Sequence, residues 1–167
     1  MSVYLEKNIP ISAGLGGGSA NSAAVIRAYK NLWSQDLIAE KDVCNLGADV
    51  PVCIDSSFQR MQGIGEQVKR LKSKLSFYLL LINSGDLIST KEVFFNLKFF
   101  NNSKLEKLPT FEKVKDLVFY LKRQRNDLEK AAFLINSNLE EVKAYMGKLN
   151  GCSLSRLSGS GGTVFGI

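Results

Sequence analysis

The sequence predicts an α+β fold, because strand and helix segments alternate early, helices dominate later and two short strands close the chain. Its 167 residues are 45% hydrophobic and 23% charged, which is ordinary for one domain or two small ones. No run approaches the roughly 20 apolar residues of a membrane span. Met1 is followed by no apolar signal segment, so we expect a cytoplasmic protein with no membrane association.

The first part of the chain predicts a strand, a loop and a helix. Val3–Leu5 alternates in polarity, which is typical of a short strand. A glycine-rich loop at residues 10–19 follows it. The Ala-rich stretch 19–33 then combines strong helix formers with apolar residues at a spacing of 3.6, so the loop is expected to open a helix.

The middle of the chain mixes both kinds of element. A second helical stretch is expected at 37–46, ended by Gly47, and Val50–Ile54 predicts a strand with a proline near its start. After it we expect a turn at 63–66, a buried strand at 77–82 and a helix at 90–97 capped by Ser89 or Thr90.

The last part of the chain is expected to be mainly helical. Helices are predicted at 111–123, 127–135 and 139–148, the last closed by Gly151. Two short strands are then expected at 154–157 and 163–167, on either side of a second glycine turn, Ser158–Gly162.

The cysteine and histidine content excludes several chemistries. Cys44, Cys53 and Cys152 are odd in number and widely spaced, and the chain has no histidine. A zinc site and a disulfide framework are therefore not expected. Without histidine there is no Ser-His or Cys-His nucleophile, so Asp, Glu, Lys and backbone groups are left to carry any chemistry.

The net charge of +6 suits either a polyphosphate ligand or a nucleic acid. Much of the excess lies between Lys98 and Arg125, where basic residues interrupt apolar ones at helical spacing. Such a pattern is more typical of a solvated helix face than of a nucleic-acid patch. We therefore expect no nucleic-acid partner.

The loop at residues 10–19 has the features of an anion site. A strand, a glycine run and a helix start place backbone N–H groups and the positive end of a helix dipole together. A flexible linker is the alternative, but linkers do not lead directly into a well-formed helix. A Walker A loop would need a lysine before Ser19, and the dinucleotide fingerprint would need a glycine at that position.

The loop resembles the Pro-x-x-x-Gly-Leu-Gly-Gly/Ser-Gly/Ser-Ser signature of the galactokinase, homoserine kinase, mevalonate kinase and phosphomevalonate kinase (GHMP kinase) superfamily. Further segments resemble its diphosphocytidyl-methylerythritol kinases, in the same order along the chain. They are residues 46–51, 63–66, 88–94 and 155–166, with a weaker match at 126–129. The segment Leu-Gly-Ala-Asp-Val-Pro at 46–51 separates this branch from its cousins.

This resemblance implies a GHMP-kinase-like fold that binds ATP and a second substrate. We expect part of an N-terminal ATP-binding domain at 1–76 and most of a helical, ferredoxin-like C-terminal domain at 77–167. The implied cofactors are ATP and Mg²⁺, and the implied partner is a small-molecule cytidine diphosphate substrate. The implied ATP-binding residues are Lys7, Pro10, Gly14, Leu15, Gly16, Gly17, Gly18, Ser19, Gly159, Ser160, Gly161 and Gly162.

The resemblance also implies individual roles. Asp49 would accept the proton of the substrate hydroxyl, although an Asp in such a segment is otherwise a loop or capping residue. Thr90 and Phe94 would contact the substrate, with the Phe94 ring against the cytosine, although Phe94 taken alone is more typical of a core residue. Lys7 would lie beside adenine or else be an exposed strand-end lysine. The Ser19 hydroxyl is a candidate Mg²⁺ contact.

Departures from the family pattern leave alternatives open. In the family, an N-terminal segment that precedes the first strand of this chain carries a lysine that works with the aspartate, and a Tyr-His pair. The family also continues beyond the last strand. We therefore expect these 167 residues alone not to be a competent kinase. The alternatives are another GHMP-type kinase, a nucleotide-binding remnant without turnover, or a nucleic-acid-binding module.

Overall fold

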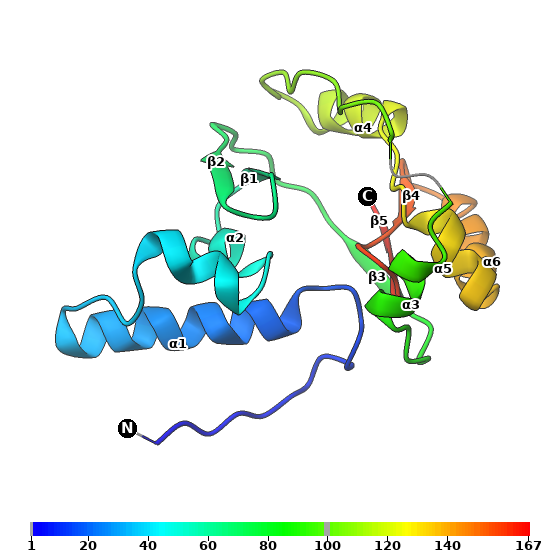
Figure 1. The fold of residues 1–167 in the computed structure, drawn as a ribbon. Coiled ribbons are helices and arrows are strands. Elements are labelled where there is room, and N and C mark those ends of the chain that lie inside the picture. The colour runs from blue at the N-terminus through cyan, green and yellow to red at the C-terminus, as the bar shows by residue number, and fades with distance from the viewer. Residues whose placement is uncertain (1, 99–100) are drawn as a thin grey trace. The chain divides into compact units, whose positions relative to one another are not determined.

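The computed structural model describes residues 2–98 and 101–167, which form two compact units (Figure 1). Unit 1 runs from the N-terminus to Leu15 and resumes from Leu75 to Ile167, and unit 2 is Gly16–Lys74. The α+β prediction is confirmed, because both units contribute helices or strands to a mixed fold. The expected domain boundary after residue 76 lies beside Leu75, whereas the first 15 residues group with unit 1.

Unit 2 is built around one long helix. It contains α1 (Gly17–Trp33), the 3-10 helix η1 (Glu40–Leu46), α2 (Val50–Ile54), β1 (Gln59–Gln62) and β2 (Gln67–Arg70). The predicted helix at 19–33 is thus confirmed and begins two residues earlier. The core of unit 2 joins α1, η1 and α2 through Ala23, Ile26, Val43 and Val50.

Three features of unit 2 differ from the prediction. The helical stretch expected at 37–46 is the 3-10 helix η1, which begins only at residue 40. Val50–Ile54 is helix α2 and not a strand. Pro51 lies in the first turn of α2, where its missing N–H and fixed φ cost nothing, and Val50 is fully buried against the core. The predicted turn at 63–66 is confirmed, but it connects two antiparallel strands, β1 and β2, that the sequence reading missed.

Unit 1 contains a three-stranded antiparallel sheet in the order β3-β5-β4. Its strands are β3 (Leu80–Asn83), β4 (Ser155–Leu157) and β5 (Thr163–Gly166). The central strand β5 pairs Val164 with Ile82 on one side and with Leu157 on the other. The second glycine turn, Ser158–Gly162, therefore connects two adjacent strands.

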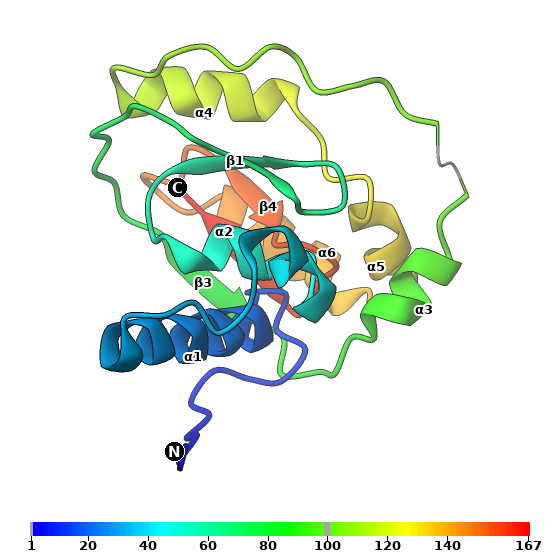
Figure 2. The ribbon, with the colours of Figure 1, turned by 60° about the vertical axis from the view of Figure 1, so that its left-hand side comes forward.

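Helices complete unit 1. They are α3 (Thr90–Phe95), α4 (Val114–Arg123), α5 (Glu129–Ile135) and α6 (Asn138–Gly147), close to the predicted positions. Ser89 caps α3 as expected, since its side chain accepts from Glu92 N. Helix α6 packs against β4 and β5, and α3 against α5 (Figure 1, Figure 2). Their shared core includes Val93, Ala132, Leu139, Met146, Leu157 and Val164.

Two strand predictions in unit 1 were wrong in whole or in part. Residues 2–9 have no regular secondary structure, because Val3–Leu5 pairs with no other strand in the part of the chain that is described. Strand β3 begins at Leu80 rather than at residue 77, and Leu80 and Leu81 are about half exposed rather than buried. Strand β3 lies at an edge of the sheet, where one side of the strand is uncovered.

Candidate functional site

The N-terminus of α1 is open. Gly16 has φ 65° and gives the helix no side-chain cap, and the first turn carries no acidic residue. The first helical hydrogen bond runs from Ala20 N to Gly16 O (2.9 Å). The amides of Gly17, Gly18 and Ser19 therefore precede the helical ladder, and among the described residues they donate to no other group. Three N–H groups and a helix dipole are available to an anion.

Glycine keeps this helix start accessible. A Cβ added at Gly17 or Gly18 would meet nothing within 4 Å, so these glycines relieve no crowding inside the protein. Their effect is to leave the space over the amides empty. A ligand oxygen could approach the backbone there without meeting a side chain.

Asp49 lies in unit 2 at the start of α2. The preceding Gly47 lies beside the first turn of α1, since a Cβ built on it would be 3.7 Å from Ser19 Oγ. Asp49 is exposed and its side chain makes no capping bond. In the described part of the chain its carboxylate has no ion-pair partner either. The carboxylate is thus free to accept a proton or a hydrogen bond from a ligand.

The thiol of Cys53 lies near this carboxylate. Burial raises the pKa of Cys53, the negative charge of Asp49 raises it further, and Arg27 opposes both effects. A raised pKa keeps the thiol protonated at neutral pH, which disfavours a nucleophilic thiolate.

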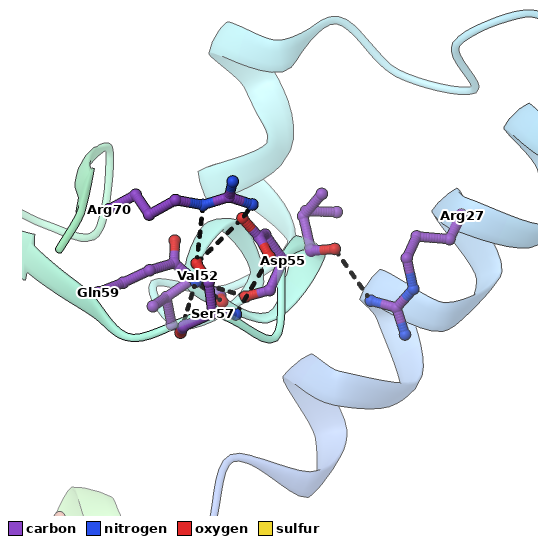
Figure 3. Close-up of polar contacts among 7 residues, drawn as sticks. Arg27, Val52, Asp55, Ser57, Gln59 and Arg70 are labelled. Carbon is purple, nitrogen blue, oxygen red and sulfur yellow. Dashed lines mark hydrogen bonds and ion pairs between the residues drawn. The ribbon is translucent and has the colours of Figure 1, made fainter. Parts of the chain in front are cut away.

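Helix α2 is held at its C-terminal end by side chains of other elements. Arg27 of α1 donates to Cys53 O (2.7 Å) and Ile54 O (3.3 Å), and Gln59 of β1 donates to Val52 O (3.0 Å). Figure 3 shows Arg27, Val52 and Gln59 with the neighbouring cluster of Asp55, Ser57 and Arg70. Donors at the last carbonyls stabilise a short helix, and so they help to hold Asp49 at its opposite end.

The hairpin turn at 63–66 also supports the segment that carries Asp49. Gly65 has φ 105°, and a Cβ there would collide with Ala48 O. The Glu66 carboxylate closes the turn by accepting from Ile64 N (2.7 Å). The structure therefore brings together the two family-like segments 46–51 and 63–66 through backbone contact at glycine.

The second glycine turn belongs to unit 1. Within it, Ser158 N donates to Thr163 O (2.9 Å) and Gly161 N donates to Ser158 O (3.0 Å). Gly159, Gly161 and Gly162 have φ values of 54°, 122° and 87°, a region that favours glycine. Among the described residues, the amides of Gly159, Ser160 and Gly162 have no acceptor.

This turn contacts the start of the first glycine loop inside unit 1. Ser158 Oγ donates to Gly14 O (2.7 Å), and a Cβ on Gly14 would collide with Gly161 O. A Cβ on Gly162 would lie 2.6 Å from Ser12 O. The two segments can be this close because Gly14 and Gly162 lack side chains. Any larger residue at either position would clash with the facing backbone.

The predicted substrate residues lie on α3. Thr90 Oγ1 is 2.8 Å from Ser160 Oγ, which joins the first residue of α3 to the second glycine turn. Phe94 is about half exposed, so it is not a core residue. Its ring lines a hollow together with Leu97, Arg125, Asn126 and Gly159. Contact of Phe94 with a base stays a prediction.

The remaining predicted residues are less constrained. Lys7 and Pro10 are exposed in the irregular N-terminal segment of unit 1. The predicted site residues thus fall into two groups, one in each unit. The sequence placed Ser158 in the second glycine turn but did not predict its bond to Gly14, and it did not predict the contact of Asn126 with the turn. The weak family match at 126–129 was the one available signal for Asn126.

The described residues contain neither a cluster of metal-binding side chains nor a membrane-spanning helix. No group of three His, Cys, Asp or Glu side chains could hold a metal ion there. None of the described helices is long and apolar enough to cross a membrane.

Comparison with known proteins gives consistent matches. Residues 1–58 match the family model described as GHMP kinases N terminal domain, and residues 104–167 match that described as GHMP kinases C terminal. A Cereibacter sphaeroides protein named 4-diphosphocytidyl-2-C-methyl-D-erythritol kinase is 38% identical over 167 residues, covering 99% of this chain and 60% of that protein. A Roseobacter denitrificans protein of the same name is 36% identical, with coverages of 98% and 56%.

A solved structure is also similar. A crystal structure of 4-(cytidine 5'-diphospho)-2C-methyl-D-erythritol kinase matches with a TM-score of 0.69 and 29% identity, covering 97% of this chain and 59% of that chain. The present chain therefore spans about 60% of the length of the relatives it matches.

Proposed function

This chain belongs to the GHMP kinase family, and we propose that it serves the ATP-dependent phosphorylation of 4-diphosphocytidyl-2-C-methyl-D-erythritol. The group phosphorylated is the 2-hydroxyl, in the non-mevalonate route to isoprenoid precursors. The names of the relatives support this substrate. The match of segment 46–51 to the same branch of the family supports it as well.

The single observation that carries the proposal is the open N-terminus of α1. The helix end has three amides without protein acceptors among the described residues, no cap and no acidic residue in its first turn, so its N–H groups are available to solvent or to an anion. The phosphates of ATP supply such an anion. We assign Gly16, Gly17, Gly18 and Ser19 to phosphate binding on this basis.

In the described part of the chain, the second glycine turn also has amides without acceptors, one at the exposed Gly159 and two at the buried Ser160 and Gly162. Gly159, Ser160 and Gly162 present N–H groups without acceptors in the described residues, and the turn packs on Gly14. On the family resemblance, we assign these residues to ATP as well, and Thr90 and Phe94 of α3 to the cytidine diphosphate substrate. Lys7, Pro10 and Leu15 are assigned to ATP by resemblance alone.

Asp49 is the proposed general base. Its carboxylate would accept the proton of the 2-hydroxyl while the hydroxyl oxygen bonds to the γ-phosphorus, and the bond between that phosphorus and the β-γ bridging oxygen breaks to release ADP. Phosphoryl transfer asks a protein mainly for positioning and charge stabilisation. Mg²⁺ bound with ATP would neutralise phosphate charge. The Ser19 hydroxyl is the group of this chain that we propose as a ligand for the ion.

The test compares two valine substitutions on α1. Gly17→Val should abolish measurable Mg²⁺-ATP binding in calorimetry, because the side chain would cover the amides while meeting nothing inside the protein. Ala24→Val places the same side chain at an exposed position of the same helix and should leave the affinity unchanged. Unchanged ATP affinity in a folded Gly17→Val variant would overturn the proposal, as would failure of the unaltered chain to bind ATP.

A further inference from the structure

The second glycine turn is poorly determined by its own bonds. Three of its five residues are glycines with positive φ, and glycine loses the most conformational freedom when it is fixed. Two backbone hydrogen bonds lie within or across the turn, and a third joins it to the residue after β3, since Gly162 O accepts from Ser84 N (2.9 Å). A turn that offers amides to a ligand must be held in one conformation by neighbouring groups, or the ligand loses affinity by ordering it.

Asn126 contacts this turn with both hydrogens of its side-chain amide. Its Nδ2 donates to Gly159 O (2.8 Å) and to Leu157 O (3.2 Å), on the last residue of β4. Its Oδ1 accepts from Leu128 N (3.0 Å) at the start of α5. The side chain therefore joins the turn to a helix that packs in the core of unit 1.

We propose that Asn126 is a positioning residue, which holds the Ser158–Gly162 turn in the conformation that presents its free amides to the ATP phosphates. The inference rests on the proposed function, because it assumes that ATP binds at this turn. Asn126 itself need not touch the nucleotide. It acts by fixing Gly159 O and Leu157 O, which directs the amides of the residues that follow.

The chain contains a matched control for this role. Asn136 precedes α6 as Asn126 precedes α5, and its Oδ1 accepts from Asn138 N (3.0 Å) in the same way. Its backbone carbonyl accepts from the residue three positions on, as that of Asn126 does. Both residues are partly buried. The difference is that Asn136 Nδ2 donates to Asp86 Oδ2 (2.6 Å) and not to the glycine turn.

Two substitutions of Asn126 separate its functions. Asn126→Ala removes the acceptor and both donors. Asn126→Asp keeps the acceptor for Leu128 N, removes the two donors and adds a negative charge. Loss of affinity in both variants assigns the effect to the donors, since the alanine variant adds no charge and the aspartate variant keeps the start of α5.

The experiment measures Mg²⁺-ATP affinity by calorimetry and amide hydrogen exchange in the whole chain. We expect both Asn126 variants to weaken ATP binding by roughly tenfold, the size of one lost hydrogen bond, and to speed exchange at residues 159–162 in the absence of nucleotide. Asn136→Ala should lower thermal stability about as much as Asn126→Ala does. It should change neither the ATP affinity nor the exchange at residues 159–162.

The outcomes distinguish this inference from the proposed function. If Gly17→Val abolishes ATP binding while both Asn126 variants bind ATP as the unaltered chain does, the positioning role is wrong and the proposed function stands. Equal loss of affinity in Asn136→Ala would also overturn it, because the effect would then be general instability. If the unaltered chain does not bind ATP, both proposals fail together.

Discussion

Ser158 Oγ donates a hydrogen bond to Gly14 O over 2.7 Å, although the two residues are 144 positions apart in the chain. The bond joins the two glycine segments inside unit 1, where a Cβ on Gly14 would collide with Gly161 O. Both contacts join residues that are far apart in the sequence. Substituting one of these residues should therefore show how much the contact between the two glycine segments stabilises unit 1.

Gly14→Ala should destabilise unit 1 more than Gly85→Ala. Both glycines have positive φ, 69° and 80°, but nothing lies within 4 Å of a Cβ on Gly85. Gly85→Ala should cost roughly 1–2 kcal/mol for left-handed backbone alone. Gly14→Ala should cost about 1–3 kcal/mol more through overpacking. Denaturant unfolding measures both variants, and equal losses would mean that the contact of Gly14 with the second turn does not form.

Arg156→Met should release the C-terminal end of α4. Arg156 Nη2 donates to Leu121 O (2.6 Å) and Gln124 O (2.8 Å), and burial lowers its pKa without discharging it. Hydrogen bonds from a charged donor contribute about 1.5–3 kcal/mol, so unit 1 should lose that much free energy of unfolding.

Arg123→Met is the control for Arg156→Met. Arg123 lies on the same helix, and its ion pair with Glu106 is largely exposed, so its loss should have a smaller effect. Thermal unfolding and exchange of the α4 amides measure both variants. Comparable losses in the two would contradict the capping role of Arg156.

The stability of unit 2 should fall in acid through Asp55. Hydrogen bonds from Arg70, and then from Ser57, hold the pKa of the Asp55 carboxyl below its usual value of 3.8; Figure 3 shows the cluster. Because the folded-state pKa is lowered, the stabilisation is complete above pH 3.8 and is lost as the pH falls through the folded-state pKa.

The matched variant for this pH dependence is Asp55→Asn. Unfolding of unit 2 is followed from neutral pH to acid in both proteins. The unaltered chain should be more stable near neutral pH, and the difference should shrink below pH 3.8. A difference that is constant with pH would show that the carboxylate charge contributes nothing.

Local patterns predicted most helices but not the contacts that hold the candidate site. Helix α1 follows from its alanines and apolar spacing, and α3 from the Ser89 cap. Helix α2 was missed because Val50–Ile54 has strand-forming side chains, and packing of Val50 against α1 overrides that preference. The bond between Ser158 and Gly14 could not be predicted, because it depends on how distant segments pack.

The candidate site shows the same division. The open start of α1 was predictable, since a glycine run before a helix leaves backbone N–H groups uncovered. The support of Asp49 was not, because it depends on Gly65 against Ala48 and on Arg27 at the far end of α2. Each of these contacts needs the folded unit 2 to bring the residues together.

Asp49→Asn should lower turnover by roughly 10²–10⁴-fold, the range for a lost general base, while substrate binding persists. The amide keeps the size of the carboxylate but accepts no proton, and no cap bond of α2 depends on it. Turnover with 4-diphosphocytidyl-2-C-methyl-D-erythritol is measured on the chain, and on the chain joined to the N-terminal segment of a relative, which supplies the expected lysine. Asp36→Asn is the control, since Asp36 makes an exposed ion pair with Lys30 in unit 2 (2.9 Å) and should leave turnover unchanged. Full turnover in Asp49→Asn would exclude Asp49 as the base, because the asparagine amide at that position cannot accept the proton.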